Sequence, residues 1–456
     1  MSERLFGTNG FRGVVGEELT PQIAVKFGYA VGTHYLGKRV AVGWDGRLSS
    51  EMLTKALMSG LLSVGAQVYE IGLAPIPVLQ KHVKENPELD YGVMTTASHN
   101  PPEYNGFKVV GPEGIEIPVS TERQIEEIFL SGEYALCEWS QVKEIRRIGD
   151  VIPTYIDSLL RNVDPDLLRE EKKTVAVDPG HGVAALTIPH ILQRIGYKAM
   201  TINAEIDGRF PIRPPEPTPE KLETLSKTVL AVGADFGVAY DGDGDRAIFC
   251  DEGGKTWWGD ASGIAIAKHL AGKGLCEVVV TPVTSTAAAE IILQPMGVEV
   301  LRTPVGSRNV SYLMRDRGAV WGWEENGGGI YAPHLLARDG GITTLLMAQL
   351  MVEEGKTLSQ VFGDLPRLWQ VKTKVRTRPE VRDRIVEALI EEYGDEEIET
   401  IDGVKIWFGK DKWVLVRPSG TEPLIRVFAE SSDRDEAAGL ADQFRKKVES
   451  LTSTLA

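Results

Sequence analysis

The chain has 456 residues, of which 42% are hydrophobic and 25% are charged, a composition typical of a globular protein with several domains and not of a disordered chain. Its net charge of -15 argues against nucleic acid or an anionic membrane as the main partner. The three cysteines are widely separated and lack Cys-x-x-Cys spacing, so we expect core thiols. No leader and no apolar stretch of ~18 residues is present, and we expect a cytoplasmic protein.

The first informative segment is a glycine-rich loop around one arginine, residues 7–13. Backbone N–H groups and the Arg12 guanidinium could approach an anion closely there. An ordinary glycine-rich turn accounts for the same residues equally well, so both interpretations stay open.

A strand, helix, strand pattern then occurs three times, over residues 40–71, 174–202 and 278–301. In the second copy the helix is expected to run over 184–195. After residue 368 the pattern changes to a strand, a helix, three strands and a final helix, and the first of those three strands is expected near 398–406.

This organisation predicts an α/β protein with three related α/β domains, built on mixed, mainly parallel sheets, and a C-terminal α+β domain. We expect linkers near residues 144–151, 251–255 and 365–367. The predicted domains are 1–150, 151–252, 253–367 and 368–456.

The most informative loop follows an apolar run at 91–94 that predicts a buried strand. Ser98 lies directly after it, and Pro101 and Pro102 restrict the backbone so that the hydroxyl is held on a stiff turn. Ser, Asn and Pro are also ordinary turn residues, so this loop alone does not establish a site.

A second loop places three carboxylates, Asp241, Asp243 and Asp245, at alternate positions between two strand-like runs. Hard oxygen ligands at this spacing suit Mg2+ or Ca2+. An EF-hand is excluded because Arg246 replaces its required glycine and the flanking segments are not helical. An acidic β-turn without a metal remains the alternative.

Two further groups of polar loops follow. Residues 322–329, with Glu324 and Asn326, offer oxygen and amide groups to sugar hydroxyls, although an exposed hairpin tip would look the same. The segment 417–426 joins arginines, hydroxyls and glycine amides into a possible phosphate cradle, with a Pro-Gly turn as its alternative.

Taken together, the four loops describe phosphoryl transfer on a sugar. Over its whole length the chain resembles the α-D-phosphohexomutase family, through Thr-Ala-Ser98-His-Asn-Pro, Asp241-Gly-Asp-Gly-Asp-Arg, Glu324-Glu-Asn-Gly and Arg417-Pro-Ser-Gly-Thr-Glu-Pro. The resemblance implies four domains around a central cleft, a phosphoserine and one Mg2+ per chain.

The resemblance also implies a role for each loop. Ser98 would pass its phosphate to a hexose phosphate through a hexose 1,6-bisphosphate, which also acts as activator, and Mg2+ would be held by phospho-Ser98 and the three aspartates. Arg12 and Arg246 would assist. Lys108, with His99, would move the hydroxyl proton if burial and cationic neighbours lower its pKa. The implied substrate-binding residues are Gly306, Ser307, Glu324, Asn326, Arg417, Ser419, Gly420, Thr421 and Arg426.

Two departures bear on the substrate and on the base. Gly328 stands where many bacterial relatives carry histidine, and the segment at Gly306 lacks the Gly-His-Ser of some phosphoglucomutases. Residues 102–108 resemble the phosphomannomutase/phosphoglucomutase branch, which we favour, whereas 417–423 are shared with phosphoglucosamine mutases. We expect a small-molecule hexose phosphate substrate and a monomer or homodimer; a non-catalytic sugar-phosphate binding protein is the alternative.

Overall fold

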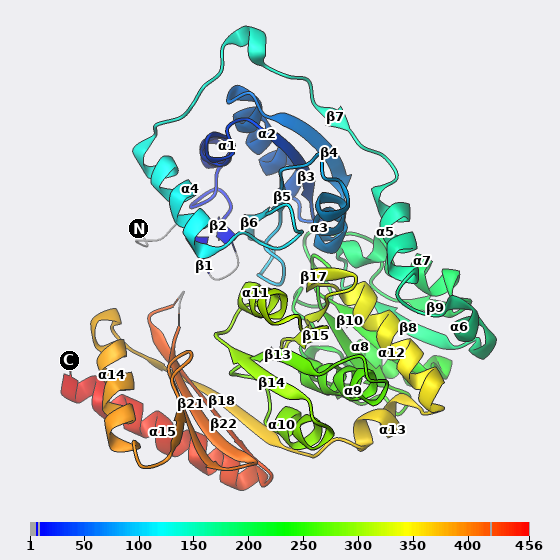
Figure 1. Cartoon of the computed structure of the whole chain (residues 1–456), viewed down its shortest axis with the longest axis vertical. Coiled ribbons are helices and arrows are strands. Elements are labelled where there is room, and N and C mark those ends of the chain that lie inside the picture. Colours follow the sequence, from blue (N-terminus) through cyan, green and yellow to red (C-terminus); the bar gives the residue numbers. More distant parts are fainter. Residues whose placement is uncertain (1–5, 8–9, 420–421, 456) are drawn as a thin grey trace. The chain divides into compact units, whose positions relative to one another are not determined.

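The computed structural model describes residues 6–7, 10–419 and 422–455, which divide into two compact units (Figure 1). The first unit comprises residues 1–262 and 326–360, and the second comprises 263–325 and 361–456. Among the described helices, none is both long and apolar enough to cross a membrane.

The first sheet lies in the first unit and has seven strands in the order β1-β2-β6-β5-β3-β4-β7. Its strands are β1 (Phe6–Gly7), β2 (Gly10–Val14), β3 (Arg39–Trp44), β4 (Gln67–Leu73), β5 (Tyr91–Thr95), β6 (Tyr104–Val110) and β7 (Arg146–Arg147). Its helices are α1 (Pro21–His34), α2 (Ser50–Ser63), α3 (Ile76–Glu85) and α4 (Val119–Ser131). β5 is parallel to β3 and buried along its whole length, as expected for a strand covered on both faces.

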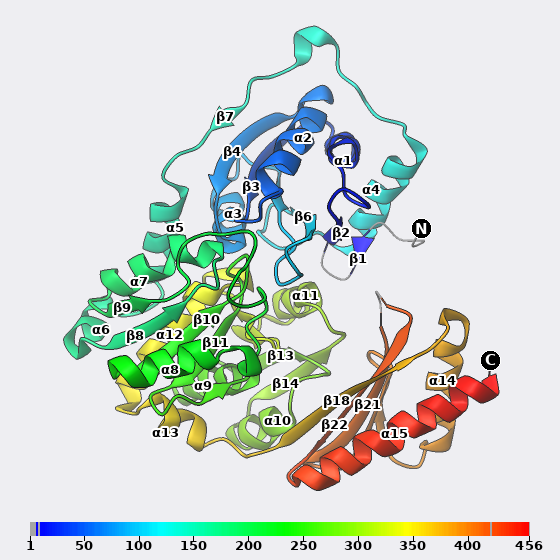
Figure 2. The same cartoon turned by 180° about the vertical axis from the view of Figure 1, so that it is seen from behind.

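A long connection, residues 132–150, links α4 to the next helix and can be followed in Figures 1 and 2 around the outside of the first sheet. It contains a short 3-10 turn (Trp139–Gln141) and the edge strand β7, which pairs in parallel with β4. The expected linker at 144–151 lies at its end.

The second sheet, also in the first unit, has the order β12-β11-β10-β8-β9. Its strands are β8 (Thr174–Asp178), β9 (Lys198–Thr201), β10 (Phe236–Tyr240), β11 (Ala247–Asp251) and β12 (Thr256–Trp257), and its helices are α5 (Val151–Leu160), α6 (Pro165–Glu171), α7 (Ile188–Arg194) and α8 (Glu223–Val232), with a 3-10 turn at Pro219–Lys221. β8, β9 and β10 are parallel, and β11 and β12 extend the sheet antiparallel.

Two sequence predictions are corrected in this sheet. The helix expected over 184–195 is a 3-10 turn, Val183–Leu186, followed by α7, because Pro189 has no N–H to continue a helix from the preceding turn. The expected linker at 251–255 is the turn of the β11–β12 hairpin, in which the Asp251 N–H donates to the Lys255 carbonyl.

The third repeat of the pattern gives three parallel strands in the second unit, β13 (Val278–Pro282), β14 (Glu299–Thr303) and β15 (Trp321–Trp323). Its helices are α10 (Ala288–Leu293), with a 3-10 turn at Gln294–Met296, and α11 (Ser307–Arg317). Helix α9 (Gly259–Gly272) and helix α13 (Leu358–Gly363) each run across a point where the chain passes between the units. The first unit contains the hairpin β16 (Gly329–Tyr331) and β17 (Leu335–Arg338), followed by α12 (Gly340–Glu354).

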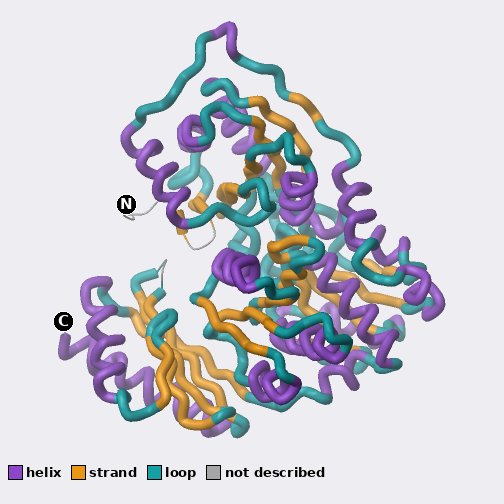
Figure 3. The backbone as a smooth tube through the Cα atoms, in the orientation of Figure 1, coloured by secondary structure: helices purple, strands orange, loops and turns teal. Residues whose placement is uncertain are grey.

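The last sheet is antiparallel, in the order β18-β22-β21-β20-β19, and Figure 3 shows its strands beside helices α14 (Pro379–Glu392) and α15 (Arg434–Leu455). Its strands are β18 (Trp369–Arg376), β19 (Glu397–Glu399), β20 (Val404–Gly409), β21 (Lys412–Pro418) and β22 (Leu424–Ser431). The single strand expected near 398–406 is a hairpin, because Gly403 adopts φ +85° and turns the chain. The predicted α/β class, with a C-terminal α+β part, is confirmed.

The side chains along β20 point alternately to the two faces of this sheet. Val404 and Ile406 join the core beneath α14 and α15, whereas Lys405 points to the opposite face, where Trp413 and Val283 lie. A buried lysine therefore occupies the apolar layer between this sheet and the loop after β13.

Candidate active site

Ser98 lies in the loop between β5 and β6 with its side chain fully buried. Its Oγ donates a hydrogen bond of 2.9 Å to Oδ2 of Asp241 and lies 3.3 Å from Nδ1 of His99. Its backbone adopts φ +50°, a left-handed conformation that is uncommon for serine. The loop therefore aims a hydroxyl at the acidic loop.

The three aspartates lie together between strands β10 and β11, so the flanks are strands and an EF-hand is excluded structurally as well. Their carboxylates offer oxygens within 4.8 Å of one another, and all three side chains are buried. Within the described part of the chain, Oδ1 of Asp243 and Oδ1 of Asp245 accept no hydrogen bond.

Crowding of these carboxylates has an electrostatic consequence. Burial, together with the neighbouring charges of Asp245 and Asp243, raises the pKa of Asp241 well above its usual range. Three convergent carboxylates, two of which keep an oxygen without a partner among the described residues, fit a divalent cation such as Mg2+. The cluster is thus a chemically suitable magnesium site.

Lys108 lies on β6 and contacts the same cluster. Its Nζ donates to Oδ2 of Asp243 at 2.9 Å and to Oδ2 of Asp245 at 3.4 Å. Burial lowers the pKa of Lys108, but the charges of Asp243, Asp245 and Glu116 outweigh burial and the net pKa is raised. The condition under which we expected Lys108 to serve as a base is not met in this arrangement, and its ammonium instead neutralises the cluster.

His99 is the other candidate for the proton. Burial, followed by the charges of Arg246, Arg12 and Arg338, lowers its pKa well below the usual value, so the imidazole is neutral near pH 7. Nδ1 lies 2.9 Å from Nη2 of Arg246. Because a guanidinium can only donate, Nδ1 carries no proton and its lone pair accepts from Arg246, while the Ser98 hydroxyl 3.3 Å away donates to Asp241.

Arg12 lies on β2, next to the serine loop. Its Nη1 donates to Oδ1 of Asn100, while its Nε and Nη2 are buried without a hydrogen-bond partner among the described residues. Burial lowers its pKa to about 10, and the side chain remains a cation at neutral pH. Two unused donors beside Ser98 fit the oxygens of a phosphate.

Two arginines of this site were missed from the sequence. Nη2 of Arg338, at the end of β17, donates to Oδ2 of Asp245 at 2.6 Å. Arg47, after β3, contacts the backbone of the serine loop. The signal available was that each arginine follows or precedes an aspartate at a strand end, Asp45-Gly-Arg47 and Arg338-Asp339, where sites of α/β proteins concentrate.

The loops expected to bind substrate form a second group. Ser307 begins α11 after Gly306, which adopts φ +126°, and Glu324 is buried directly after β15. Asn326 belongs to the first unit, where its Oδ1 accepts from the Gly328 N–H at 3.2 Å. Of the last loop, Gly420 and Thr421 lie outside the described residues.

Within the second unit, Asp402 connects two of these loops. Its Oδ2 accepts hydrogen bonds from the Arg417 side chain, with 2.9 Å to Nη2, and from the Val305 N–H at 3.0 Å. Arg417 is therefore already engaged by a carboxylate, whereas Arg426 donates to the more exposed Glu422. Ser419 is tied to the loop itself through hydrogen bonds with residues 422 and 424.

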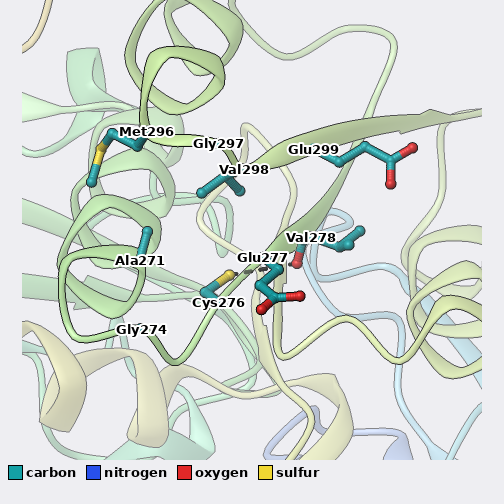
Figure 4. A pocket seen from close by; sticks show the side chains of 9 residues that line it. All are labelled: Ala271, Gly274, Cys276, Glu277, Val278, Met296, Gly297, Val298 and Glu299. Carbon is teal, nitrogen blue, oxygen red and sulfur yellow. Dashed lines mark hydrogen bonds between the residues drawn. The ribbon is translucent and has the colours of Figure 1, made fainter.

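A surface hollow of about 550 Å3 in the second unit lies at the amino ends of β13 and β14 (Figure 4). Cys276 lines it, and its Sγ donates to the Val278 carbonyl at 3.5 Å. Burial raises the pKa of this thiol to about 11, so it is unreactive. The hollow is distant from the carboxyl strand ends and adds no chemistry to the site.

Four family models match the chain in order. They are described as the α/β/α domains I, II and III of phosphoglucomutase/phosphomannomutase, at residues 3–135, 153–254 and 258–368, and its C-terminal domain, at residues 370–447. The serine loop falls in the first match and the three-aspartate loop in the second.

Among similar proteins, a phosphoglucosamine/phosphogalactosamine mutase of Sulfurisphaera tokodaii is 41% identical over 98% of this chain and 99% of its own length. A phosphoglucomutase/phosphomannomutase of Thermococcus kodakarensis is 40% identical over 95% of this chain and 96% of its own. The crystal structure of a putative phosphomannomutase from Thermus thermophilus superposes with a TM-score of 0.84 at 27% identity, covering 98% of this chain and 100% of the other. This chain therefore belongs to the phosphoglucomutase/phosphomannomutase family, the α-D-phosphohexomutases, and is a phosphohexomutase.

Proposed function

We propose that this chain interconverts the 1-phosphate and the 6-phosphate of a hexose through phospho-Ser98 and a hexose 1,6-bisphosphate. The observation that carries the proposal is the 2.9 Å hydrogen bond from Ser98 Oγ to Asp241, which brings a nucleophile to the edge of a three-carboxylate cluster. A protein that only bound sugar phosphates would have no use for that pairing.

The reaction has two halves. In the first, the bond between Ser98 Oγ and phosphorus breaks as the free hydroxyl of the hexose phosphate attacks, and the hydroxyl proton passes to a base. Ser98 Oγ takes up a proton as it leaves. In the second, Ser98 Oγ attacks the other phosphorus of the bisphosphate and gives up its proton, the bond between that phosphorus and the sugar oxygen breaks, and the sugar oxygen takes up a proton. Mg2+ on Asp241, Asp243 and Asp245 would neutralise charge on the transferring phosphoryl group.

The chain's own side chains supply the remaining requirements. Neutral His99, with Nδ1 at 3.3 Å from Ser98 Oγ, is our proposed acceptor for the serine proton, which requires that Arg246 Nη2 first releases Nδ1. Arg12 and Arg246 are proposed to bind the phosphate oxygens, because both guanidinium groups are buried beside the serine loop and have donors without partners among the described residues. Lys108 is proposed to neutralise part of the charge of the aspartates when no metal is bound.

We propose that the substrate is recognised by the loops at Gly306, at Glu324 and at residues 417–426. Glu324 and Asn326 carry oxygens suited to sugar hydroxyls. Arg417, Ser419 and Arg426, with Gly420 and Thr421, are proposed to bind the phosphate that is not being transferred, through bidentate guanidinium contacts and loop amides.

For the sugar itself, we propose glucose or mannose, on the likeness of residues 102–108 to that branch and of the whole chain to the Thermococcus protein. Glucosamine is a second candidate, favoured by the 41% identity to the Sulfurisphaera mutase. The two classes differ at C2. Glucose and mannose carry a hydroxyl there, whereas glucosamine carries an amine that is cationic when protonated.

One assay tests the function and selects the sugar. The purified chain is supplied with Mg2+ and a trace of glucose 1,6-bisphosphate, and kcat/KM is compared for glucose, mannose and glucosamine 1-phosphates. Isomerisation without net phosphate release, with one phosphate on the protein by intact mass, is expected. Tight binding without turnover would contradict the proposal and identify a binding protein, and stoichiometric phosphate release would identify a hydrolase.

A further inference from the structure

Arg47 lies against the serine loop and donates four hydrogen bonds to its backbone. Nη2 donates to the carbonyl oxygens of Ser98 at 2.8 Å and Asn100 at 2.6 Å. Nη1 donates to the carbonyls of Pro101 at 2.7 Å and Tyr104 at 2.9 Å. All four hydrogens of the two terminal nitrogens are used, and the side chain is buried.

The serine loop has little regular structure to hold it otherwise. β5 ends at residue 95 and β6 begins at residue 104, and between them only the two end residues, Thr96 and Glu103, share backbone hydrogen bonds with Gly106 and Val15. The left-handed φ of Ser98 is one that non-glycine residues keep only when their surroundings impose it. The Arg47 guanidinium, a planar fork with fixed donor directions, supplies such a constraint.

Arg47 is itself fixed by its neighbours. Its Nε lies 3.3 Å from Oδ2 of Asp45, an oxygen that also accepts a 2.7 Å hydrogen bond from Thr96 Oγ1. The ring of Phe210 lies beneath the guanidinium at 5.2 Å. A Cβ at Gly208 would come within 2.7 Å of the Arg47 Cα, so the backbone of the loop after β9 presses directly on this arginine.

We propose that Arg47 is a positioning residue for phosphoryl transfer, which holds the Ser98 loop so that Oγ faces Asp241. This inference rests on the phosphoserine mechanism proposed above. Arg47 acts through the backbone and not on the phosphate, since its terminal nitrogens are committed to carbonyl oxygens. Its removal should therefore impair transfer to and from Ser98 more than binding of the sugar phosphate.

The variant Arg47→Lys tests this, because lysine keeps the charge but offers three hydrogens from one nitrogen and cannot reach four carbonyls. The rate of Ser98 phosphorylation by glucose 1,6-bisphosphate is followed in a single turnover by intact mass, and kcat and KM are measured separately. We expect the phosphorylation rate and kcat to fall about 100-fold. KM should stay within about threefold, as for a loss confined to the transition state.

Arg302→Lys is the matched control. Arg302 pairs with Glu290 and donates to the carbonyls of Pro282, Ser285 and Thr286, so it braces a loop in the same manner, but in the second unit. If bracing matters only for stability, both variants lower the melting temperature and neither changes Ser98 phosphorylation. We expect only Arg47→Lys to slow phosphorylation.

A folded Arg47→Lys protein that phosphorylates at the wild-type rate overturns the inference while leaving the proposed function intact. A wild-type protein that never acquires phosphate and does not isomerise overturns both. If Arg47→Lys does not fold, Asp45→Asn replaces it, because the substitution keeps the shape of the side chain but removes the carboxylate that orients Arg47. We expect about a tenfold slower phosphorylation for that variant, and an unchanged rate overturns the inference.

Discussion

The hydroxyl of Ser98 donates to Oδ2 of Asp241, 143 residues further along the chain, over 2.9 Å between two fully buried side chains. This contact joins the serine loop after β5 to the acidic loop after β10. Each loop projects from the carboxyl end of a strand, which is where α/β sheets place their sites.

Ser98→Ala should abolish both the mutase activity and the protein-bound phosphate, because no other described hydroxyl donates to the three-aspartate cluster at a distance as short as the Ser98 bond. Intact mass and the isomerisation assay provide the two readouts. Ser158→Ala removes another buried hydroxyl, which donates to the Tyr155 carbonyl within α5, and should leave both unchanged. Retained isomerisation in Ser98→Ala would rule out the phosphoserine.

Asp243→Asn should weaken divalent-cation binding by at least about tenfold, because it removes one of three converging carboxylates. Binding of Mn2+ followed by electron paramagnetic resonance measures this without reference to activity. Asp251→Asn, a buried carboxylate at the end of β11 that accepts from Trp257 Nε1, is the control and should bind Mn2+ as the wild type does. Equal affinities for all three proteins would refute the metal site.

The same site predicts stabilisation by metal. Mg2+ at about 100 times its dissociation constant should raise the free energy of unfolding by about 2.7 kcal/mol, since the ion binds the folded chain and not the unfolded one. Chelation should remove that increment. Asp243→Asn should show a smaller response at the same Mg2+ concentration, and a full response there would contradict the assignment.

Lys405 should make stability rise with pH above neutrality. Burial, followed by the charge of Arg302, lowers its pKa to about 7, against about 10.4 in an unfolded chain. Between these values the unfolded state binds more protons, so the free energy of unfolding rises with pH by up to about 1.4 kcal/mol per pH unit. The stability gained in this way is lost again as pH falls toward 7.

Glu430, whose charge interacts with that of Lys405, changes the free energy of unfolding at lower pH and with the opposite sign. Burial raises the pKa of Glu430, so its contribution is present below the ordinary glutamate pKa and is lost as pH rises through its folded pKa. Denaturation can be followed by tryptophan fluorescence, to which Trp413 contributes with its ring centroid 4.0 Å from Lys405 Nζ. Lys405→Met should flatten the alkaline slope, whereas exposed Lys410→Met should not; a slope that survives Lys405→Met would exclude this lysine as its source.

Asp402→Asn should raise KM for the hexose phosphate by roughly tenfold, equivalent to about 1.4 kcal/mol, with little change in kcat. The carboxylate orients Arg417 and anchors the Val305 N–H, so its loss disturbs two substrate loops together. Asp411→Asn, in the next turn of the same sheet, is the control. Unchanged kinetics in Asp402→Asn would exclude a role for this link in substrate binding.

The loops of the site could be predicted from sequence because each is a local pattern. Ser98 and the three aspartates follow apolar strand segments, and their meaning depends on neighbours within a few residues. For Arg47 and Arg338 the local signal is only a neighbouring aspartate at a strand end, and it does not identify their partners, which lie 51 residues away, for Arg47 to Ser98, and 93 residues away, for Arg338 to Asp245.

The protonation state of Lys108 could not be predicted from the sequence, for a different reason. Its pKa depends on whether burial or the nearby carboxylates have the larger effect, and that balance depends on distances such as the 2.9 Å to Asp243. The helix break before α7 and the hairpin at Gly403 were in principle visible, through Pro189 and through an Asp-Gly pair.

Gly242 stands between Asp241 and Asp243, and a Cβ at its position would lie 2.5 Å from the Ser98 carbonyl oxygen. The acidic loop therefore packs directly against the backbone of the serine loop, in addition to presenting carboxylate oxygens. An engineer who grafted only the Asp-Gly-Asp-Gly-Asp segment onto another scaffold would transfer a metal chelator. To transfer the proposed phosphate carrier, both loops would have to be moved as one piece.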